Sequence, residues 1–395
     1  MNLVDASAGR KQESEHTTPR ICMPSFRNVA RMPFQCGRYE AQDVLTDVDA
    51  VEVIDIRPTD AFRFKARWQR RLMYRDVSKR LIFQNPGLQK VRLTRDYDVF
   101  MAVCSTYWDL PYLNAIEGWK DRCKTSVCWI DEMWVSEIPY YKYWLHFLNQ
   151  FDYVFVGFRG TTEPLAKAIG QPCHWIPAAV DALRFTPYPK PPARVIDVYS
   201  VGRRGEGMHR ALRQAADRGD LFYVHDTFRG EGLEVADDRQ HRDMFASMAK
   251  RSQFFLVAPT ETSYTQGQVE IAFRYFEGAA AGTVMIGQAP KTDAFPLLFP
   301  WQDAVVQVER DGSDTLATLA ALRSQPERVS AIRRRNTAEA LLRHDWVYRW
   351  KEIFRVAGIQ PLAGMAARER LLKEAATVAA PPSDAGSLFD TLRIS

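Results

Sequence analysis

The chain has 395 residues, of which 46% are hydrophobic and 26% charged, and these proportions exclude a fibrous protein and a largely disordered one. A domain usually takes ~100–200 residues, so the length predicts two domains. The formal charge of +5 is too small by itself to indicate a nucleic-acid partner, and we expect none. It is compatible with an anionic small molecule or with contact to a membrane surface.

Cysteines and histidines show no spacing that is typical of metal ligands. No two of the six Cys form C-x-x-C and several lie in apolar runs, which predicts reduced, mostly buried thiols in a cytosolic protein. The seven His are scattered, without an H-E-x-x-H pair. We therefore expect no metal and no cofactor.

No apolar run approaches the ~18–20 residues of a membrane span, and the polar N-terminus lacks the apolar core of a signal peptide. We expect a cytoplasmic protein that can lie at the inner membrane as a peripheral protein. Residues 1–19 read as a disordered leader.

Short apolar runs alternate with longer helical stretches through the first half of the chain. The predicted strands are 51–56, 97–104, 125–130, 153–157 and 173–176. The predicted helices are 109–121, 138–149 and 161–169, and the basic, aromatic segment 63–80 also has a helical pattern. This alternation is typical of parallel βαβ units in a Rossmann-like sheet.

The segment 186–194 carries four Pro in nine residues and predicts a linker between domains 20–185 and 195–345. The alternation then restarts. The predicted strands are 195–201, 222–225, 254–258, 284–287 and 303–308, and the predicted helices are 208–218, 243–252, 269–281, 316–324, 327–342 and 346–356. Residues 363–395 are expected to be a partly flexible tail.

Two such halves predict an α/β fold with two Rossmann-like, parallel-sheet domains that face each other across a cleft. In open parallel sheets, ligands bind beyond the carboxyl ends of the strands. Side chains that directly follow a predicted strand are therefore the first candidates for a site.

The stretch 266–287 is the most informative for function. On a helix, Glu270, Arg274 and Glu277 stand at i, i+4 and i+7 and share one face. Gly267 would begin that helix, where free N–H groups and the helix dipole favour a phosphate, and a carboxylate further along could bind ribose hydroxyls. The same spacing also fits an intrahelical ion-pair ladder on a solvated face, and both interpretations stay open.

The sequence FRYFEGAAAGTVMIG at 273–287 resembles the donor-site helix of bacterial GT-B glycosyltransferases of the group-one type. The resemblance implies that Glu277 binds the ribose of a sugar nucleotide. Retaining members carry a second Glu eight residues upstream. Position 269 is Val here, and the neighbouring Glu270 is the candidate for this catalytic carboxylate.

Three further stretches resemble that family. IPAAVDALRFTP (176–187) is similar to the segment that joins the two domains, and VYSVGRR (198–204) to the first strand and Gly-Arg turn of the C-terminal domain. LRHDWVYR (342–349) is similar to the segment that crosses back to the N-terminal domain, which implies a crossover helix in 346–362.

The resemblance implies a metal-independent glycosyltransferase of polysaccharide biosynthesis, whose donor is a nucleoside-diphosphate sugar and whose acceptor is a glycan, a lipid-linked saccharide or a small molecule. Gly202, Arg203 and Arg204 would face the diphosphate, since guanidinium groups suit phosphate oxygens. Adjacent Arg residues after a strand can also be merely solvated. His225 and Thr260 follow other predicted strands of this domain and are further donor-site candidates.

An inverting transferase needs a general base for the acceptor hydroxyl. Asp131 and Glu132 directly follow the predicted strand 125–130 and are the candidates for this role. They can equally be read as the N-terminal cap of the helix predicted from Ile138. The Arg-rich loop 27–38 is expected to line the acceptor side.

The basic, aromatic segment 63–80 has two interpretations: a solvated helix that covers the sheet, or contact with an anionic membrane surface or a lipid-linked acceptor. For the whole chain, the alternatives to a transferase are a non-catalytic nucleotide-sugar or glycan-binding protein on the same scaffold and a sugar-nucleotide epimerase. The oligomeric state cannot be read from the sequence.

Overall fold

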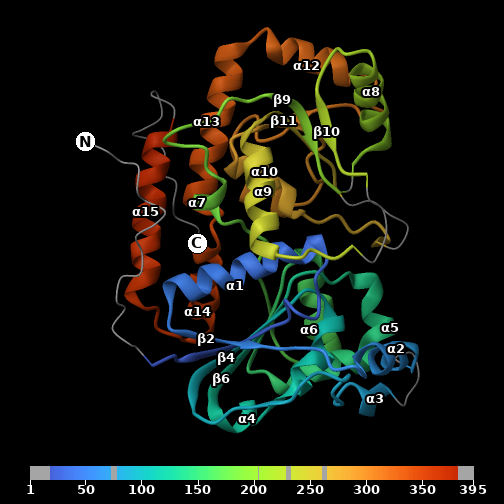
Figure 1. Cartoon of the computed structure of the whole chain (residues 1–395), viewed down its shortest axis with the longest axis vertical. Helices are drawn as coiled ribbons and strands as arrows, with labels where there is room; N and C mark the ends of the chain where they lie inside the picture. Colours follow the sequence, from blue (N-terminus) through green and yellow to red (C-terminus); the bar gives the residue numbers. More distant parts are fainter. Residues whose placement is uncertain (1–17, 73–77, 203, 228–232, 260–264, 381–395) are drawn as a thin grey trace.

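A computed structural model describes residues 18–72, 78–202, 204–227, 233–259 and 265–380. Figure 1 shows the molecule as two stacked parts, one built on each of two parallel sheets. Two of the candidate residues, Arg203 and Thr260, lie outside the described residues.

The N-terminal part is built on a six-stranded parallel sheet in the order β2-β1-β4-β6-β7-β8. Its strands are β1 (Ile21–Ser25), β2 (Val51–Asp55), β4 (Tyr97–Cys104), β6 (Cys123–Ile130), β7 (Tyr153–Val156) and β8 (Cys173–Trp175). The centre of this sheet is buried on both faces, which explains why its strands read as continuous apolar runs.

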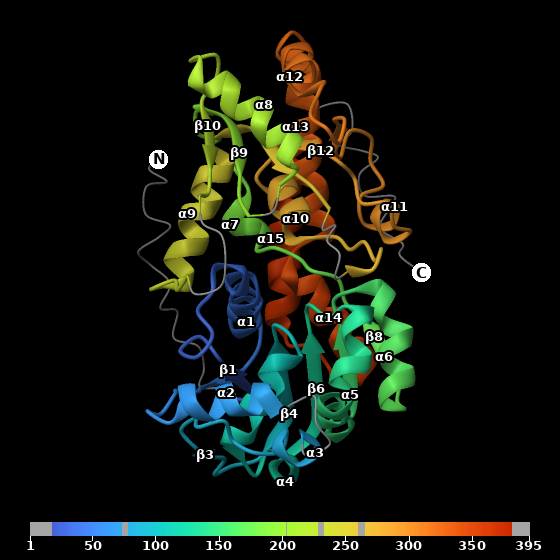
Figure 2. The ribbon, with the colours of Figure 1, turned by 90° about the vertical axis from the view of Figure 1, so that its right-hand side faces the viewer.

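Helices and short 3-10 turns connect these strands and cover both faces of the sheet (Figure 2). The α-helices are α1 (Cys36–Val48), α2 (Phe62–Leu72), α3 (Ser78–Leu81), α4 (Trp119–Arg122), α5 (Ile138–Leu145), α6 (Thr162–Ile169) and α7 (Ala182–Phe185). The 3-10 helices are η1 (Pro33–Gln35), η2 (Tyr107–Ala115), η3 (Val135–Glu137), η4 (His146–Gln150) and η5 (Arg159–Thr161). The strands β3 (Val91–Arg92) and β5 (Ile116–Glu117) form a separate small pair.

The C-terminal part is built on a five-stranded parallel sheet in the order β10-β9-β11-β12-β13. Its strands are β9 (Ile196–Ser200), β10 (Tyr223–His225), β11 (Ser252–Val257), β12 (Val284–Gly287) and β13 (Val306–Gln307). The helices are α8 (Glu206–Asp217), α9 (Asp238–Lys250), α10 (Phe273–Ala280), α11 (Ala294–Leu298), α12 (Thr315–Arg323), α13 (Pro326–Arg343), α14 (Trp346–Ala357) and α15 (Ala363–Ala379).

The expected architecture of two parallel α/β sheets is confirmed, and the Pro-rich segment 186–194 lies between them. The exact domain limits stay a prediction. The segment 363–379, expected to be part of a tail, forms helix α15. This helix packs against α13 and α1, and its Met365 and Leu372 are buried there.

Strand β1 and helix α1 are absent from the predicted elements, and the first predicted strand corresponds to the edge strand β2. β1 is short and fully buried, and Pro24 and Ser25 interrupt its apolar run. Helix α1 lacks the usual alternation of apolar and polar residues, because the polar residues Arg38, Glu40 and Gln42 are buried on its packed side. A helix that buries charged side chains does not have the apolar stripe by which a surface helix is recognised in a sequence.

The predicted helix 109–121 is wrong. Residues 107–115 form the 3-10 helix η2 with Pro111 inside it, and β5 and the short helix α4 follow. Proline removes a backbone donor, and Gly118 adopts a left-handed conformation with φ of 85°. The chain therefore turns twice where an uninterrupted helix was predicted.

Helix α14 joins the two parts. Trp346 and Trp350 of α14 pack edge-on against Trp129 of β6, with ring centroids 5.5 and 6.2 Å apart. The indole N–H of Trp350 donates to the backbone oxygen of Ala41 on α1 at 2.9 Å. A helix from the C-terminal end of the chain is thus part of the hydrophobic core of the N-terminal domain.

Candidate functional site between the two sheets

Helix α10 begins at Phe273, with Ala272 as its N-cap, and so begins later than predicted. Residues 268–272 are irregular, which corrects two expectations. Gly267 does not begin the helix: it lies six residues before it, in a left-handed turn with Gln266. Glu270 does not share a helical face with Arg274 and Glu277.

Tertiary contacts explain the late start, since the segment before α10 contacts the N-terminal part instead of coiling. The side-chain oxygen of Gln268 accepts a hydrogen bond from the backbone N–H of Val135 at 2.8 Å. Its amide nitrogen donates to Thr161 Oγ1 at 3.0 Å. The segment therefore joins the loops that follow β6 and β7 to the second sheet.

Glu270 lies in this joining segment and is buried. Its Oε1 accepts hydrogen bonds from the backbone N–H of Gly160 at 3.1 Å and from the amide of Gln268 at 2.7 Å. Burial raises the pKa of Glu270, and these donors oppose the shift. The carboxylate is thus held by N–H groups of both parts of the molecule.

Glu277 belongs to a buried ionic network that crosses between the two parts. Its Oε1 accepts from the guanidinium of Arg242 on α9 at 2.5 Å. The same guanidinium binds both carboxylate oxygens of Glu40 on α1, at 2.8 and 3.1 Å. Glu40 also accepts from Arg184 at 3.1 Å and from the indole of Trp346 at 3.2 Å. No hydrogen bond from a described residue reaches Glu277 Oε2.

Gly202 and Arg274 meet beyond the carboxyl end of β9. Gly202 adopts a φ of 68°, and the guanidinium of Arg274 lies where a side chain at position 202 would begin. An L side chain there would be strained by the backbone conformation and would displace the guanidinium of Arg274. The first turn of α10 therefore places the guanidinium of Arg274 at the loop after β9.

Asp226 organises the same loop from the end of β10. Its carboxylate accepts from the backbone N–H of Gly202 and from the guanidinium of Arg204, both at 2.6 Å. His225 lies next to Asp226, with Nδ1 3.0 Å from its backbone oxygen, and its ring packs against His209 of α8 with centroids 4.9 Å apart. The structure thus brings together four of the predicted donor-site residues: Gly202, Arg204, His225 and Arg274.

Asp131 lies on the N-terminal side, directly after β6, and it is buried. Its carboxylate forms an ion pair with Arg38 of α1 at 3.1 Å. Burial raises the pKa of Asp131 to about 6, and Arg38 opposes the shift. Gly157, at the end of β7, lies so close that a side chain there would overlap the backbone of Asp131.

Glu132 is half-buried next to Asp131, and its carboxylate accepts from the indole N–H of Trp134 at 3.2 Å. Neither acid caps the following helix, because the N-cap of α5 is Glu137. The capping interpretation of these two residues is therefore wrong.

Helix α1 connects Asp131 of the N-terminal domain to the helix that carries Arg274 in the C-terminal domain. Arg38, the partner of Asp131, follows Gly37, and a Cβ on Gly37 would lie 2.7 Å from the ring of Phe273. Phe273 is the first residue of α10, next to Arg274. One end of α1 therefore places a buried carboxylate of the first sheet near the helix that carries two candidate donor-site residues.

Sequence reasoning missed the partners of these residues. Arg242 and Glu40 are 202 positions apart, and nothing local marks them as a pair. Arg38 was included only as part of an Arg-rich loop. The signal that the sequence offers is weak: three charged residues lie within helices that pack together, Arg38 and Glu40 on α1 and Arg242 on α9.

Among the described residues, no three His, Cys, Asp or Glu side chains are placed to hold a metal ion together. Within the same ranges, no helix has both the length and the apolar character needed to span a membrane. All six cysteines are free thiols.

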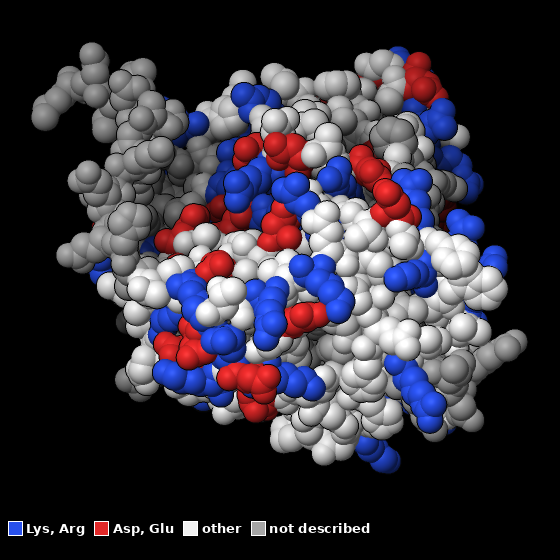
Figure 3. Space-filling view, turned by 60° about the horizontal axis from the view of Figure 1, so that its bottom comes forward, with Lys and Arg blue, Asp and Glu red and all other residues white. Residues whose placement is uncertain are grey.

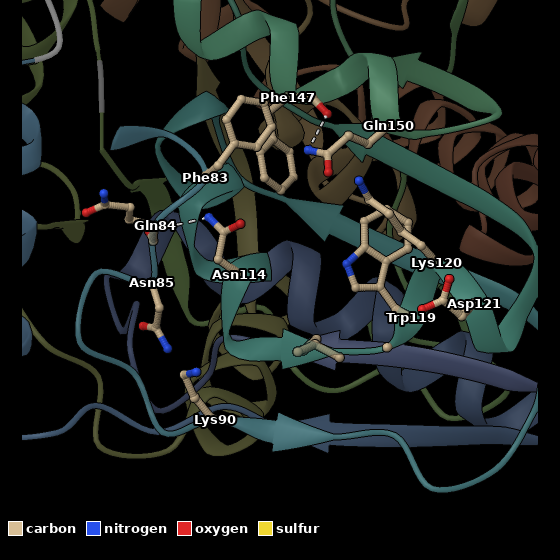
Figure 4. Close-up of a pocket in the computed structure, with 12 residues that line it drawn as sticks. Phe83, Gln84, Asn85, Lys90, Asn114, Trp119, Lys120, Asp121, Phe147 and Gln150 are labelled. Atoms are coloured by element: carbon tan, nitrogen blue, oxygen red, sulfur yellow. Dashed lines mark hydrogen bonds between the residues drawn. The ribbon is translucent and has the colours of Figure 1, made fainter. Parts of the chain in front are cut away.

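A pocket of about 440 Å³ lies elsewhere, beside α4 and the start of β6, and none of the candidate residues lines it. In Figure 4 the rings of Phe83 and Phe147 lie together on its wall, with centroids 5.6 Å apart. Asn114 also lines the pocket, and its amide donates to the backbone oxygens of Ile82 and Pro111, at 2.7 and 3.0 Å. The pocket is at the amino ends of the strands, so it does not belong to the site described above.

Residues 203–355 match the family model described as glycosyl transferase-like. Comparison with curated protein sequences finds no match.

Solved structures match along most of the chain. An alpha-glucosyltransferase in complex with UDP and a 13-mer DNA containing a HMU base is 12% identical, with a TM-score of 0.52, over 87% of this chain and 100% of that one. An alpha-glucosyltransferase in complex with UDP-glucose and DNA containing an abasic site gives the same values. HepE from Anabaena, in complex with UDP-glucose, is 11% identical with a TM-score of 0.45, over 86% of this chain and 99% of that one.

Two parallel-sheet domains that match the glucosyltransferase structures over most of both chains define the GT-B fold. Residues 203–355 match a glycosyl transferase-like domain. The expected fold class is thereby confirmed, and the domain match supports the expected enzyme class.

Proposed function

We propose that this protein transfers a sugar, a hexose, from a UDP-sugar to an acceptor hydroxyl, without a metal ion. The glycosyl transferase-like domain supports the reaction class. UDP and UDP-glucose in the glucosyltransferase structures of the same fold support the donor. The acceptor class, a glycan, a lipid-linked saccharide or a small molecule, and a place in polysaccharide biosynthesis remain part of the proposal. The free thiols support a cytoplasmic location.

The observation that carries the proposal is the meeting of Arg274 and Arg204 at Gly202. Two guanidinium groups at the carboxyl end of a parallel strand suit a diphosphate, because their planar N–H donors match phosphate oxygens. They would stabilise the negative charge that develops on the leaving UDP. Arg203, in the same turn, is proposed to assist, and Thr260 and His225 to border the nucleotide.

Glu277 is proposed to bind the ribose hydroxyls. Arg242 holds one oxygen of this carboxylate and thereby fixes its orientation. The second oxygen is the acceptor left for a hydroxyl donor. The network through Arg242 and Glu40 then couples the ribose site to α1 of the acceptor-side domain.

Asp131 is proposed to act as the general base that takes the proton of the acceptor hydroxyl. With a pKa raised to about 6, the carboxylate is mostly ionised near neutral pH and still basic enough to accept a proton. Arg38 holds it in place. Glu132 is the second candidate for the same role.

Glu270 was expected to be catalytic, and we now propose a positioning role for it. Its bonds to Gly160 and Gln268 hold the segment before α10 against the loop after β7. Loss of these bonds would displace the first turn of α10, and with it Arg274.

A thermal-shift titration with UDP, GDP, ADP and TDP tests the donor site. A ligand at 100 times its Kd stabilises the native state by about 2.7 kcal/mol, so UDP should raise the melting temperature of the wild type. Arg274→Ala should abolish the shift. Arg328→Ala is the matched control, since Arg328 lies on α13 of the same domain and pairs only at the surface, with Asp303. Absence of a shift with every nucleotide would contradict the proposal.

Turnover separates the transferase from its two alternatives. A transferase releases UDP from UDP-glucose when an acceptor is present, and slowly to water when it is not. An epimerase converts the donor to an isomeric UDP-sugar without releasing UDP. A binding protein shifts its melting temperature with UDP-sugar but leaves the donor unchanged.

A further inference from the structure

Helix α2 carries an unusual outer surface on the side of the N-terminal domain that faces the viewer in Figure 2. Phe62, Ala66 and Gln69 point inward, and Gln69 is fixed by hydrogen bonds to the backbone oxygens of Leu81 and Gln84 at 3.0 and 2.9 Å. The outward residues are only aromatic or basic: Arg63, Phe64, Lys65, Arg67, Trp68, Arg70 and Arg71. Helix α2 contains no acidic residue.

The aromatic residues of this surface are exposed to a degree that a core or a solvated helix does not require. Phe64 is 68% and Trp68 46% exposed, although their rings lie only 6.1 Å apart at i and i+4. Two more exposed aromatic residues lie on the same side, Phe83 just after α3 and Tyr140 on α5. An exposed aromatic cluster of this kind marks a contact surface.

The charges of α2 differ from those of the neighbouring surface. Near the amino ends of the sheet strands, three cations have acidic partners: Arg122 pairs with Asp96, Lys124 with Asp98, and Lys90 with Glu117. Among the described residues, by contrast, no carboxylate lies within ion-pair distance of the five basic residues of α2. In Figure 3, acidic and basic side chains lie side by side on the left of the face shown.

We propose that the outer surface of α2 binds the surface of an anionic lipid bilayer. Basic side chains attract anionic headgroups, and Phe and Trp side chains insert at the boundary between headgroups and acyl chains. Nucleic acid would satisfy the cations, but a double helix gives no reason for two adjacent, outward-facing aromatic side chains. The proposal does not depend on the donor site, because the proposed donor-site residues belong to the C-terminal domain, and α2 belongs to the N-terminal one.

Co-sedimentation with vesicles tests the proposal on the full-length protein. The wild type should bind vesicles of phosphatidylcholine with about one third phosphatidylglycerol, and should stay in solution with phosphatidylcholine alone. Each basic residue near an anionic surface contributes roughly fivefold in affinity, so Arg63→Gln/Lys65→Gln/Arg67→Gln should weaken binding about a hundredfold. Phe64→Ser/Trp68→Ser should weaken it tenfold or more without a change of charge.

The matched control is Lys90→Gln/Arg122→Gln/Lys124→Gln, which removes the same charge from paired positions of the same domain and should bind vesicles like the wild type. All variants should keep the wild-type melting temperature and its shift with UDP, which shows that the fold and the donor site are intact. Equal loss in the control and in the α2 variants would overturn the proposal. So would failure of the wild type to bind anionic vesicles, or binding to duplex DNA that is as tight as binding to vesicles and insensitive to Phe64→Ser/Trp68→Ser.

Discussion

Replacing Arg242 by Met should destabilise the whole molecule, because Arg242 is the cation of a buried network between the two domains. Its side chain is 5% exposed, and those of Glu40 and Glu277 are 0% and 5% exposed. Met fills a similar volume but leaves Glu277 without its ion-pair partner. Glu40 retains Arg184 and Trp346. Breaking a buried pair costs about 3–5 kcal/mol.

The expected shift in melting temperature follows from the chain length. An unfolding entropy of ~2.1 cal/mol/K per residue gives about 0.8 kcal/mol/K for the 395 residues, so a loss of this size lowers the Tm by roughly 4–6 °C. Calorimetry or circular dichroism at neutral pH measures it. If the two domains unfold separately, the domain that melts first shows the larger shift.

Arg239→Met is the matched control on the same helix. Arg239 pairs with Asp43 at 2.8 Å, but its side chain is 65% exposed, and an exposed pair contributes at most about 1 kcal/mol. Its Tm should therefore fall by roughly 1 °C or less. Equal shifts for the two variants, or no loss in Arg242→Met, would refute the argument that burial determines the cost.

Three further predictions concern the site. Asp131→Asn should lower the transfer rate at least ~100-fold, whereas the wild-type rate should rise with pH through about 6 as the carboxylate ionises; a pH profile that Asp131→Asn leaves unchanged would exclude this base. Because burial raises its pKa, Asp131 should make the wild type lose stability relative to Asp131→Asn as pH rises from 3.8 to about 6, which denaturation at several pH values measures. Gly202→Ala should weaken UDP binding in a titration, since the methyl group displaces Arg274.

Much of the C-terminal domain could be predicted from the sequence, because its local signals agree with its packing. The strand 284–287 was predicted to the residue, and helices α12, α13 and α14 to within one residue at each end. Each of these segments is an apolar run or an amphipathic helix with its own turn signals. The resemblance of 273–287 to a donor-site helix comes from this same domain.

The N-terminal domain was harder to predict, and α1 shows why. Ten of its thirteen residues are buried, including Arg38 and Glu40. Their charges are satisfied by Asp131 and Arg242, which lie about 90 and 200 positions further along the chain. A local pattern cannot show that a charged residue is buried when its partner is far along the chain or, as for Glu40, belongs to the other domain.

The sequence by itself determined the alternation of strands and helices, the Pro-rich segment between two α/β halves and the match of 203–355 to a glycosyl transferase-like domain. These features depend on periodicity and on a contiguous stretch of residues. Only the tertiary structure decided where α10 begins and what Glu270 and Glu277 contact. Residues 268–272 favour no conformation strongly, so their bonds to Val135, Gly160 and Thr161 outweigh one more helical turn. These bonds form only when the N-terminal and C-terminal domains are in contact.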